Sequence, residues 1–144
     1  MVTYGTCEQL ERASHIAHSV ACHLRLLATA ACAQRGPSFQ LCAHSFAAGM
    51  HGLSDAVREL QDQLDELPIS SHHEANRELA QCSRIATRVA GLMQLTADAI
   101  GESRVNELEL DVEDFLASVQ YQADRLREIE GALNLVQRRL AATG

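Results

Sequence analysis

The chain has 144 residues, of which 47% are apolar and only 3% aromatic, and its formal net charge is −7. This length suits a single domain over residues 1–144, and an apolar fraction made mostly of Ala and Leu favours helices over a β-sandwich. An acidic chain repels phosphate backbones, which argues against nucleic-acid binding, and the absence of Lys excludes a Schiff-base or P-loop lysine.

The cellular location is predicted from the charged residues near the N-terminus, the lengths of the apolar runs and the spacing of the cysteines. A signal peptide contains an uninterrupted apolar run near the N-terminus. In this chain the charged residues Glu8, Glu11 and Arg12 interrupt that region. No run of about 18 apolar residues predicts a membrane-spanning helix. The five cysteines lack a paired Cys-x-x-Cys spacing, which favours reduced thiols over a disulfide framework. We therefore expect a cytoplasmic protein without a membrane anchor.

The first predicted helix spans about residues 7–35 and the second about 39–67. Thr6-x-x-Gln9 matches a capping box at the start of the first helix. The pair Gly36-Pro37 would end it, because Gly suits the position after a helix and Pro cannot continue one. The second helix is expected to begin directly after this turn.

The third predicted helix spans about residues 72–100 and the fourth about 104–141. Ser71-x-x-Glu74 matches a second capping box. The acidic segment 107–114 would form the first turns of the fourth helix, and Arg138-Arg139 would lie near its end. Both placements suit the helix dipole.

Apolar residues recur at alternating steps of three and four in each predicted helix. Steps sustained over this length indicate helices packed nearly antiparallel with a left-handed supercoil. Because the connections are short, we predict an all-α fold, an antiparallel up-down-up-down four-helix bundle with heptad-type core packing. Cys42, Cys82 and Gln122 also fall on these seams. A core Gln needs a hydrogen-bond partner, and we interpret Gln122 as a residue that sets the register.

A possible metal-binding stripe lies on the first helix. Glu11, His15, His18 and Cys22 share one helix face, and the spacing of His18 and Cys22 suits a zinc ion or another transition metal, with His15 or Glu11 as a further ligand. A single straight helix rarely completes a tetrahedral site, so a second helix or subunit would have to contribute. The alternative interpretation is an ordinary polar face, for which no cofactor is expected.

The segment Ala43-His44-Ser45-Phe46, followed by Leu53, resembles the phosphoacceptor helix of histidine phosphotransfer domains. The resemblance covers about a dozen residues and implies a helical bundle that carries phosphate on His44. That family usually has Lys and Gly at the third and fourth positions after its His, where this chain has Ala47 and Ala48.

Residues 26–53 contain a single formally charged residue, Arg35. A helix that is apolar or neutral on every side is normally covered on every side, so the outer face of this hairpin predicts a partner surface for a second copy of the chain or another protein. Its expected members are Leu26, Ala30, Ala33, Leu41, His44, Ala48 and His51.

No catalytic motif is recognisable, so we do not expect an enzyme. The sequence favours a non-enzymatic helical interaction protein that acts as an adaptor, chaperone, immunity or regulatory factor, forms a homodimer or binds a protein partner, and binds neither nucleic acid nor membrane. Two alternatives remain: a metal-binding or metal-sensing bundle that uses His15, His18 and Cys22, and a divergent histidine phosphotransfer module at His44.

Overall fold

A computed structural model describes residues 4–67 and 72–143 of the protein, and most of them are helical. In chain order the elements are α1 (Tyr4–Cys32), β1 (Ser38–Cys42), α2 (Ala43–Asp65), α3 (His73–Glu102), β2 (Glu107–Asp111) and α4 (Val112–Thr143). The all-α class is confirmed for the bulk of the chain, although two short strands interrupt the predicted helices. In this part of the chain no helix combines the length and the apolar character needed to cross a membrane.

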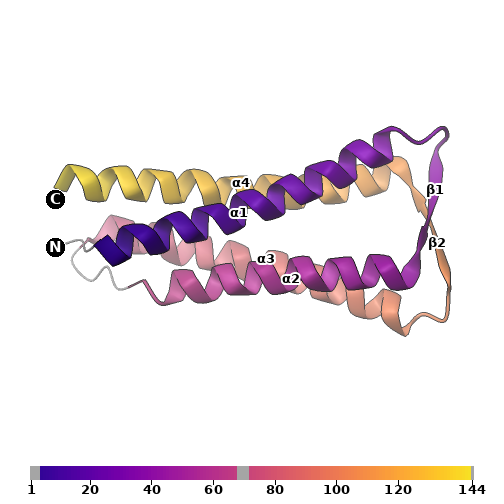
Figure 1. Ribbon diagram of the computed structural model, residues 1–144, viewed down its shortest axis with the longest axis horizontal. Helices are drawn as coiled ribbons and strands as arrows, with labels where there is room; N and C mark the ends of the chain where they lie inside the picture. The colour runs from indigo at the N-terminus through magenta and orange to yellow at the C-terminus, as the bar shows by residue number, and fades with distance from the viewer. Residues whose placement is uncertain (1–3, 68–71, 144) are drawn as a thin grey trace.

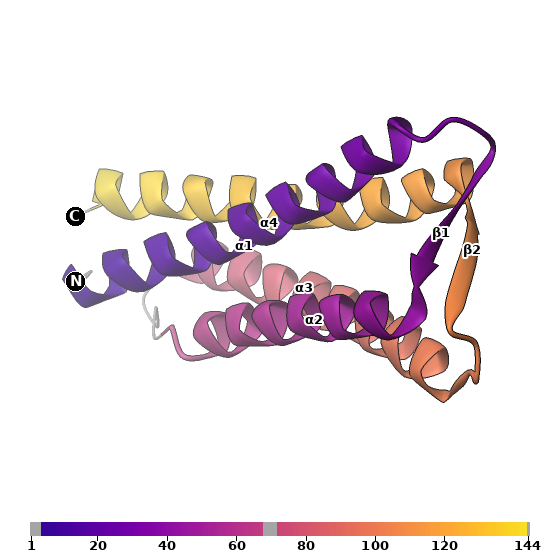
Figure 2. The same ribbon diagram turned by 45° about the vertical axis from the view of Figure 1, so that its right-hand side comes forward.

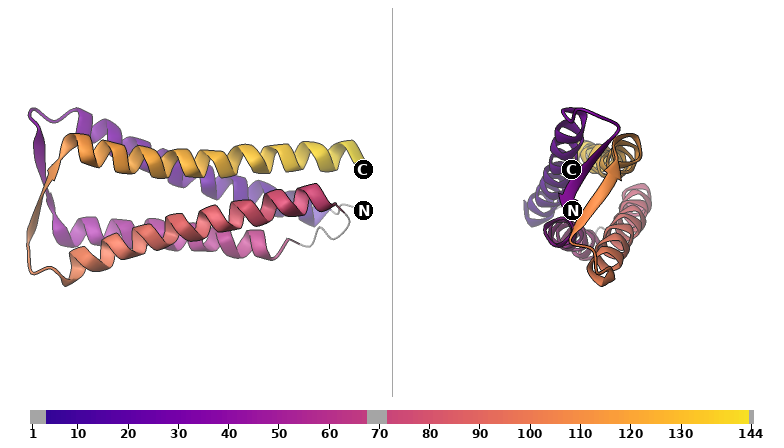
Figure 3. Two further views of the ribbon diagram at one scale, coloured as in Figure 1. Left: turned by 180° about the vertical axis from the view of Figure 1, so that it is seen from behind. Right: turned by 90° about the vertical axis from the view of Figure 1, so that its right-hand side faces the viewer.

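The helices pack as two pairs. α1 lies along α4, α2 lies along α3, and the contacts within each pair are more extensive than those between the pairs. Both termini lie at one end of the elongated molecule and both strands at the other (Figure 1). The two pairs of helices diverge toward the strand end (Figures 2 and 3), where the strands cross the end of the molecule.

The two strands correct the predicted bounds of the second and fourth helices. They form an antiparallel ribbon in which Phe39 pairs with Leu110 and Leu41 with Leu108. In both strands these apolar residues are half-buried and the polar residues between them are exposed. This alternation has the period of a β-strand and can be read within each segment, but the pairing of the two segments, which lie far apart in the sequence, cannot.

The ribbon also provides the starts of two helices. The first N–H of α2, from Ala43, donates to the carbonyl of Asn106 at 2.9 Å, and that of α4, from Val112, donates to the carbonyl of Pro37 at 2.8 Å. The Asp111 carboxylate accepts from the N–H of Asp114 at 3.0 Å, as an N-cap residue does. The segment 107–111 is therefore strand, which corrects the prediction that it forms the first turns of the fourth helix.

Helix α1 begins earlier and ends earlier than predicted. Because it starts at Tyr4, Thr6 lies inside the helix and is not its cap. The helix ends at Cys32, and Gly36 then turns the chain toward β1 with a φ of +147°, a conformation that favours glycine.

Helix α3 begins one residue after the predicted start. Its N-cap residue is His72, whose Nδ1 accepts from the N–H of Ala75 at 3.2 Å. The predicted cap, Ser71, lies outside the described residues.

The core follows the predicted apolar seams closely in α1 and α4. In α4 every seam position from Phe115 onward is buried, and in α1 only Leu27 is half-buried. In α2 the buried face is rotated slightly, so that Ala47 and Ser54 are buried where the prediction has Phe46 and Leu53. Cys82 is buried as predicted, but Cys42 is exposed, because it ends the strand and does not lie on a helix seam.

The three phenylalanines of the sequence meet at the strand end. The ring centroids of Phe39 in β1 and Phe115 in α4 lie 5.2 Å apart in an edge-to-face arrangement, and those of Phe46 in α2 and Phe115 lie 6.1 Å apart. This cluster connects the ribbon to one helix of each pair and closes the core below it.

Candidate functional sites

An apolar groove of about 610 Å³ opens between α1 and the segment formed by β1 and α2. All of its lining residues except His23 lie within residues 26–53, where Arg35 is the only charged residue. The groove exists because the two walls are carried by different pairs of helices, which diverge at this end of the molecule (Figure 2). Its lining residues are His23, Leu26, Leu27, Leu41, Cys42, Ser45, Phe46, Gly49, Met50 and Leu53.

Two residues of the predicted partner surface, Leu26 and Leu41, lie in this groove. Leu26 is 67% exposed and Leu41 is half-buried. Ala30, near the end of α1, and Ala33, directly after it, are exposed but do not line the groove. Leu26 and Leu41 are therefore the members of the prediction that line one concave surface.

The remaining predicted members lie on α2, on a face that does not line the groove. His44 and Ala48 are exposed and do not line the groove. His51 is half-buried, and its Nε2 lies 3.5 Å from Oδ1 of Asp98 in α3. At about 100° per residue, His44, Ala48 and His51 share one face of α2 that points away from α1. The predicted surface is thus divided between the α1 and β1 side, which includes the groove, and the face of α2 that points away from α1.

Cys42 lies at the edge of the groove, directly before α2. Its side chain forms no capping hydrogen bond with the helix. The pKa of its thiol is nevertheless lowered, chiefly by the side chain of Ser45 and then by the backbone N–H groups of Ser45 and His44, because these groups favour the thiolate. By contrast, burial raises the pKa of the Cys82 thiol to about 11, so that this cysteine stays protonated.

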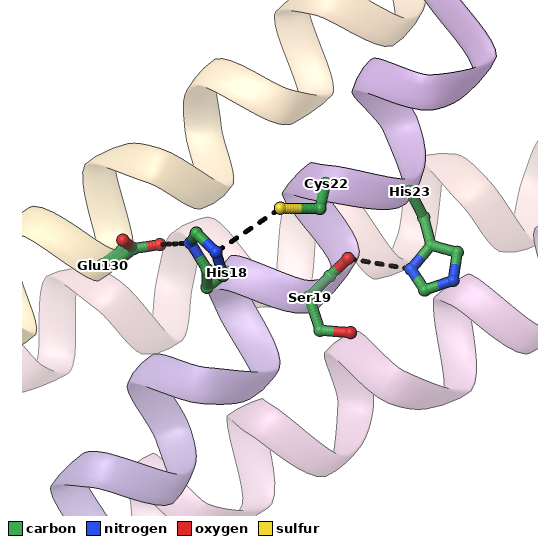
Figure 4. Close-up of polar contacts among 5 residues, drawn as sticks. All are labelled: His18, Ser19, Cys22, His23 and Glu130. Carbon is green, nitrogen blue, oxygen red and sulfur yellow. Dashed lines mark hydrogen bonds and ion pairs between the residues drawn. The ribbon is translucent and has the colours of Figure 1, made fainter.

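A chain of three polar side chains joins α1 to α4. His18 is at its centre: Nδ1 lies 3.0 Å from Oε2 of Glu130, and Nε2 lies 3.5 Å from Sγ of Cys22. Figure 4 shows the imidazole ring between the carboxylate and the thiol. His23, one residue after Cys22, is not part of this chain, since its Nδ1 lies 2.8 Å from the carbonyl oxygen of Ser19.

The predicted metal site is only partly assembled. Cys22 and Glu130 contact opposite nitrogens of the His18 ring, Nε2 and Nδ1 respectively, so one ion bound to a ring nitrogen could not take both of these side chains as further ligands. Across residues 4–67 and 72–143, no group of three or more His, Cys, Asp or Glu side chains is positioned to hold a metal ion. His15 and Glu11 line an open cavity of about 510 Å³ between α1 and α2, and they also line an open cavity of about 400 Å³ between α1 and α4 together with His18 and Glu130.

Glu130 contacts His18 but is not among the residues that the sequence predicts for this site. The spacing of His18 and Cys22 shows that they share a helix face, but nothing in the local sequence shows which residue of α4 lies opposite. Only the packing of α1 against α4 selects Glu130 from the acidic residues of that helix.

The predicted phosphoacceptor, His44, is exposed in the first turn of α2. Ala47, at the third position after it, is buried, and Ala48 is exposed. This exposure suits a phosphoacceptor as well as an ordinary surface histidine, so the phosphotransfer interpretation stays a prediction.

Comparison with known protein families, curated proteins and solved structures finds nothing that matches this chain. The groove and the Cys22–His18–Glu130 chain are therefore interpreted from their own geometry.

Proposed function

We propose that the protein is a non-enzymatic interaction module, an adaptor, chaperone, immunity or regulatory factor, that binds an apolar element of a second copy or of another protein. The observation that carries this proposal is the apolar groove between α1 and the β1–α2 segment, in the one stretch of the chain that is almost free of charge. The groove has a volume of about 610 Å³.

We also propose that the four helices form an antiparallel up-down-up-down bundle with heptad-type packing. Two observations support it: both termini lie opposite the strands, and the seam positions of α1 and α4 are buried with few exceptions. In such a bundle each helix keeps an outer face. At the strand end of α1, Leu26 is exposed beside the groove and is therefore available for association.

The energetics of the groove favour an apolar occupant. Full burial of a leucine side chain contributes about 1.5–3 kcal/mol, so covering Leu26 and completing the burial of Leu41 would give a useful part of a binding free energy. Gly49 in the wall leaves room for a close approach, since nothing lies within 4 Å of the position where its Cβ would be. A second copy of the chain is the simplest occupant, because symmetric dimers are the commonest oligomers.

The proposal is tested with Leu26→Asp, and Leu95→Asp is the matched control. Both leucines are 67% exposed and lie on helices, but only Leu26 lines the groove. We expect the full chain to increase the fluorescence of an anilinonaphthalene dye and to self-associate in sedimentation velocity at micromolar concentration. Leu26→Asp should weaken both effects by about tenfold or more, because a carboxylate is costly to desolvate.

Leu95→Asp should leave both effects unchanged. If the wild-type chain binds no dye and sediments as a monomer, or if both variants behave alike, the groove is not an interaction surface and the proposal is wrong.

A further inference from the structure

The Cys22–His18–Glu130 chain has the order of groups that activates a thiol. Since a carboxylate only accepts hydrogen bonds, the contact of 3.0 Å between Nδ1 of His18 and Oε2 of Glu130 requires that Nδ1 carries the proton. In the neutral imidazole the lone pair is then on Nε2, which faces Sγ of Cys22 at 3.5 Å. A nucleophile, a base within reach of it, and a third group that orients the base are the parts of an activated nucleophile.

The elements hold these groups in place while leaving them accessible. His18 and Cys22 are four residues apart on α1 and therefore lie one turn apart on the same face. Glu130 comes from α4, the helix that packs most closely along α1. The side chains of His18 and Glu130 are 61% and 26% exposed, and Cys22 is half-buried, so a small reagent can reach the sulfur.

The hydrogen-bond donors around Cys22 indicate which type of electrophile its thiolate could attack. Attack on an ester or thioester creates an oxyanion, which needs hydrogen-bond donors that are not already engaged. Cys22 is within a continuous helix, Tyr4–Cys32, whose interior backbone N–H groups are used by the helix itself. Thiol–disulfide exchange creates no oxyanion and needs only an attacking thiolate and a leaving thiolate.

We propose that Cys22, His18 and Glu130 form a thiol-exchange site that accepts one half of a small-molecule disulfide. Nε2 of His18 takes the proton of the Cys22 thiol, and the thiolate attacks one sulfur of the disulfide. A new bond forms between Sγ and that sulfur, and the original S–S bond breaks. The other half leaves as a thiolate and takes the proton back from His18, so atoms and electrons balance without a further oxidant.

The product is a mixed disulfide that the other thiols of α1 cannot resolve. Cys32 is ten residues further along the helix, about 15 Å along its axis, and Cys7 is fifteen residues away in the other direction. Cα atoms joined by a disulfide are at most about 7 Å apart. No thiol of α1 can therefore form an internal disulfide with Cys22 and release the small molecule.

The test measures the reaction of Cys22 with 4,4′-dithiodipyridine, an uncharged disulfide that releases a coloured product. One protein keeps Cys22 and has Cys7, Cys32 and Cys42 replaced by Ser, while the buried Cys82 is retained. The control protein keeps Cys32 in place of Cys22. Cys32 is also on α1, but the residue four positions before it is Ala28 and not a histidine. His18→Ala and Glu130→Gln are introduced into both, and circular dichroism checks that each variant is folded.

We expect His18→Ala to lower the rate of Cys22 by roughly tenfold and Glu130→Gln to lower it by roughly twofold to threefold, because the base is lost in the first variant and only less well oriented in the second. Free imidazole should restore much of the rate in His18→Ala, a rescue that a purely structural role would not show. Mass spectrometry should locate the adduct on Cys22.

The rate of Cys32 should be the same with His18 and with Ala at position 18. The proposal is overturned if His18→Ala leaves the Cys22 rate unchanged, if it lowers the Cys22 and Cys32 rates equally, or if imidazole fails to rescue the folded variant. None of these outcomes depends on whether the apolar groove binds a partner.

Discussion

Among single residues, Gln122 is the clearest departure from an apolar core. It is 2% exposed, and its Oε1 has no hydrogen-bond partner among the described residues. The other polar residue in the middle of the core is satisfied, because Ser54 donates to the carbonyl of Ala90 at 3.0 Å. The expectation that Gln122 finds a hydrogen-bond partner is therefore not met for its carbonyl oxygen.

Replacing Gln122 by Leu should stabilise the protein. The unpaired oxygen is removed, the volume is similar, and the expected gain in the free energy of unfolding is about 1 kcal/mol, measured by urea denaturation. Gln120→Leu, two residues away on the exposed face of α4, should change it by less than about 0.5 kcal/mol. A loss of stability in Gln122→Leu would show instead that the amide is hydrogen-bonded in solution.

Among the elements, the β1–β2 ribbon decides how the two pairs of helices are joined at their open end. Its inner face carries Phe39, which pairs with Leu110 across the ribbon and contacts Phe115 in α4 edge to face. Its outer face is polar, and Ser38 donates to Oε1 of Glu109 at 3.2 Å. The inner apolar row, and not the polar one, should therefore hold the ribbon on the helices.

Phe39→Ala tests this role of the ribbon. The variant loses the ring contact with Phe115 and part of the apolar burial under the ribbon, and we expect a loss of about 2 kcal/mol of unfolding free energy, less than for a fully buried phenylalanine. Hydrogen exchange of the strand amides should become faster. Gln40→Ala, the adjacent exposed position, should have little effect on either measurement, and an equal effect of both substitutions would contradict the assignment.

At the scale of the whole molecule, a cluster of charged side chains links the two pairs of helices at the end opposite the ribbon. One nitrogen of Arg139 in α4 lies 2.6 Å from Oε1 of Glu78 and 3.2 Å from Oε2 of Glu74, both in α3. Arg139 was expected in the last turn of its helix, but α4 continues to Thr143, and the side chain instead joins the two pairs. Aromatic packing thus joins the pairs at one end and an ionic cluster joins them at the other.

Arg139→Met should weaken this end while keeping most of the aliphatic packing. We expect a loss of about 1 kcal/mol at low salt and less at high salt, because the pair is partly exposed and therefore screened. The measurement is urea denaturation at two salt concentrations. Arg138→Met, at the neighbouring exposed position, should be nearly neutral at both, and a salt-independent loss in Arg139→Met would mean that packing and not charge accounts for it.

Much of the fold follows from the sequence by itself. The recurrence of apolar residues at steps of three and four determines which faces of α1 and α4 are buried, because that spacing matches the helical repeat whatever the helices pack against. The lack of charge around Arg35 likewise marks the end of the molecule that carries the groove. These features are local, so they can be recognised along one segment of the chain.

The remaining features depend on segments that are far apart in the sequence. The strands form because residues 38–42 and 107–111 pair with each other, and the groove exists because its walls belong to different pairs of helices. Glu130 reaches His18 across 112 positions. Hydrogen bonds and apolar contacts of this kind depend on how the helices pack, which the spacing of residues within one segment does not encode. For this reason only the tertiary structure shows that the thiol and the imidazole of the predicted stripe on α1 lie in contact with a carboxylate of α4.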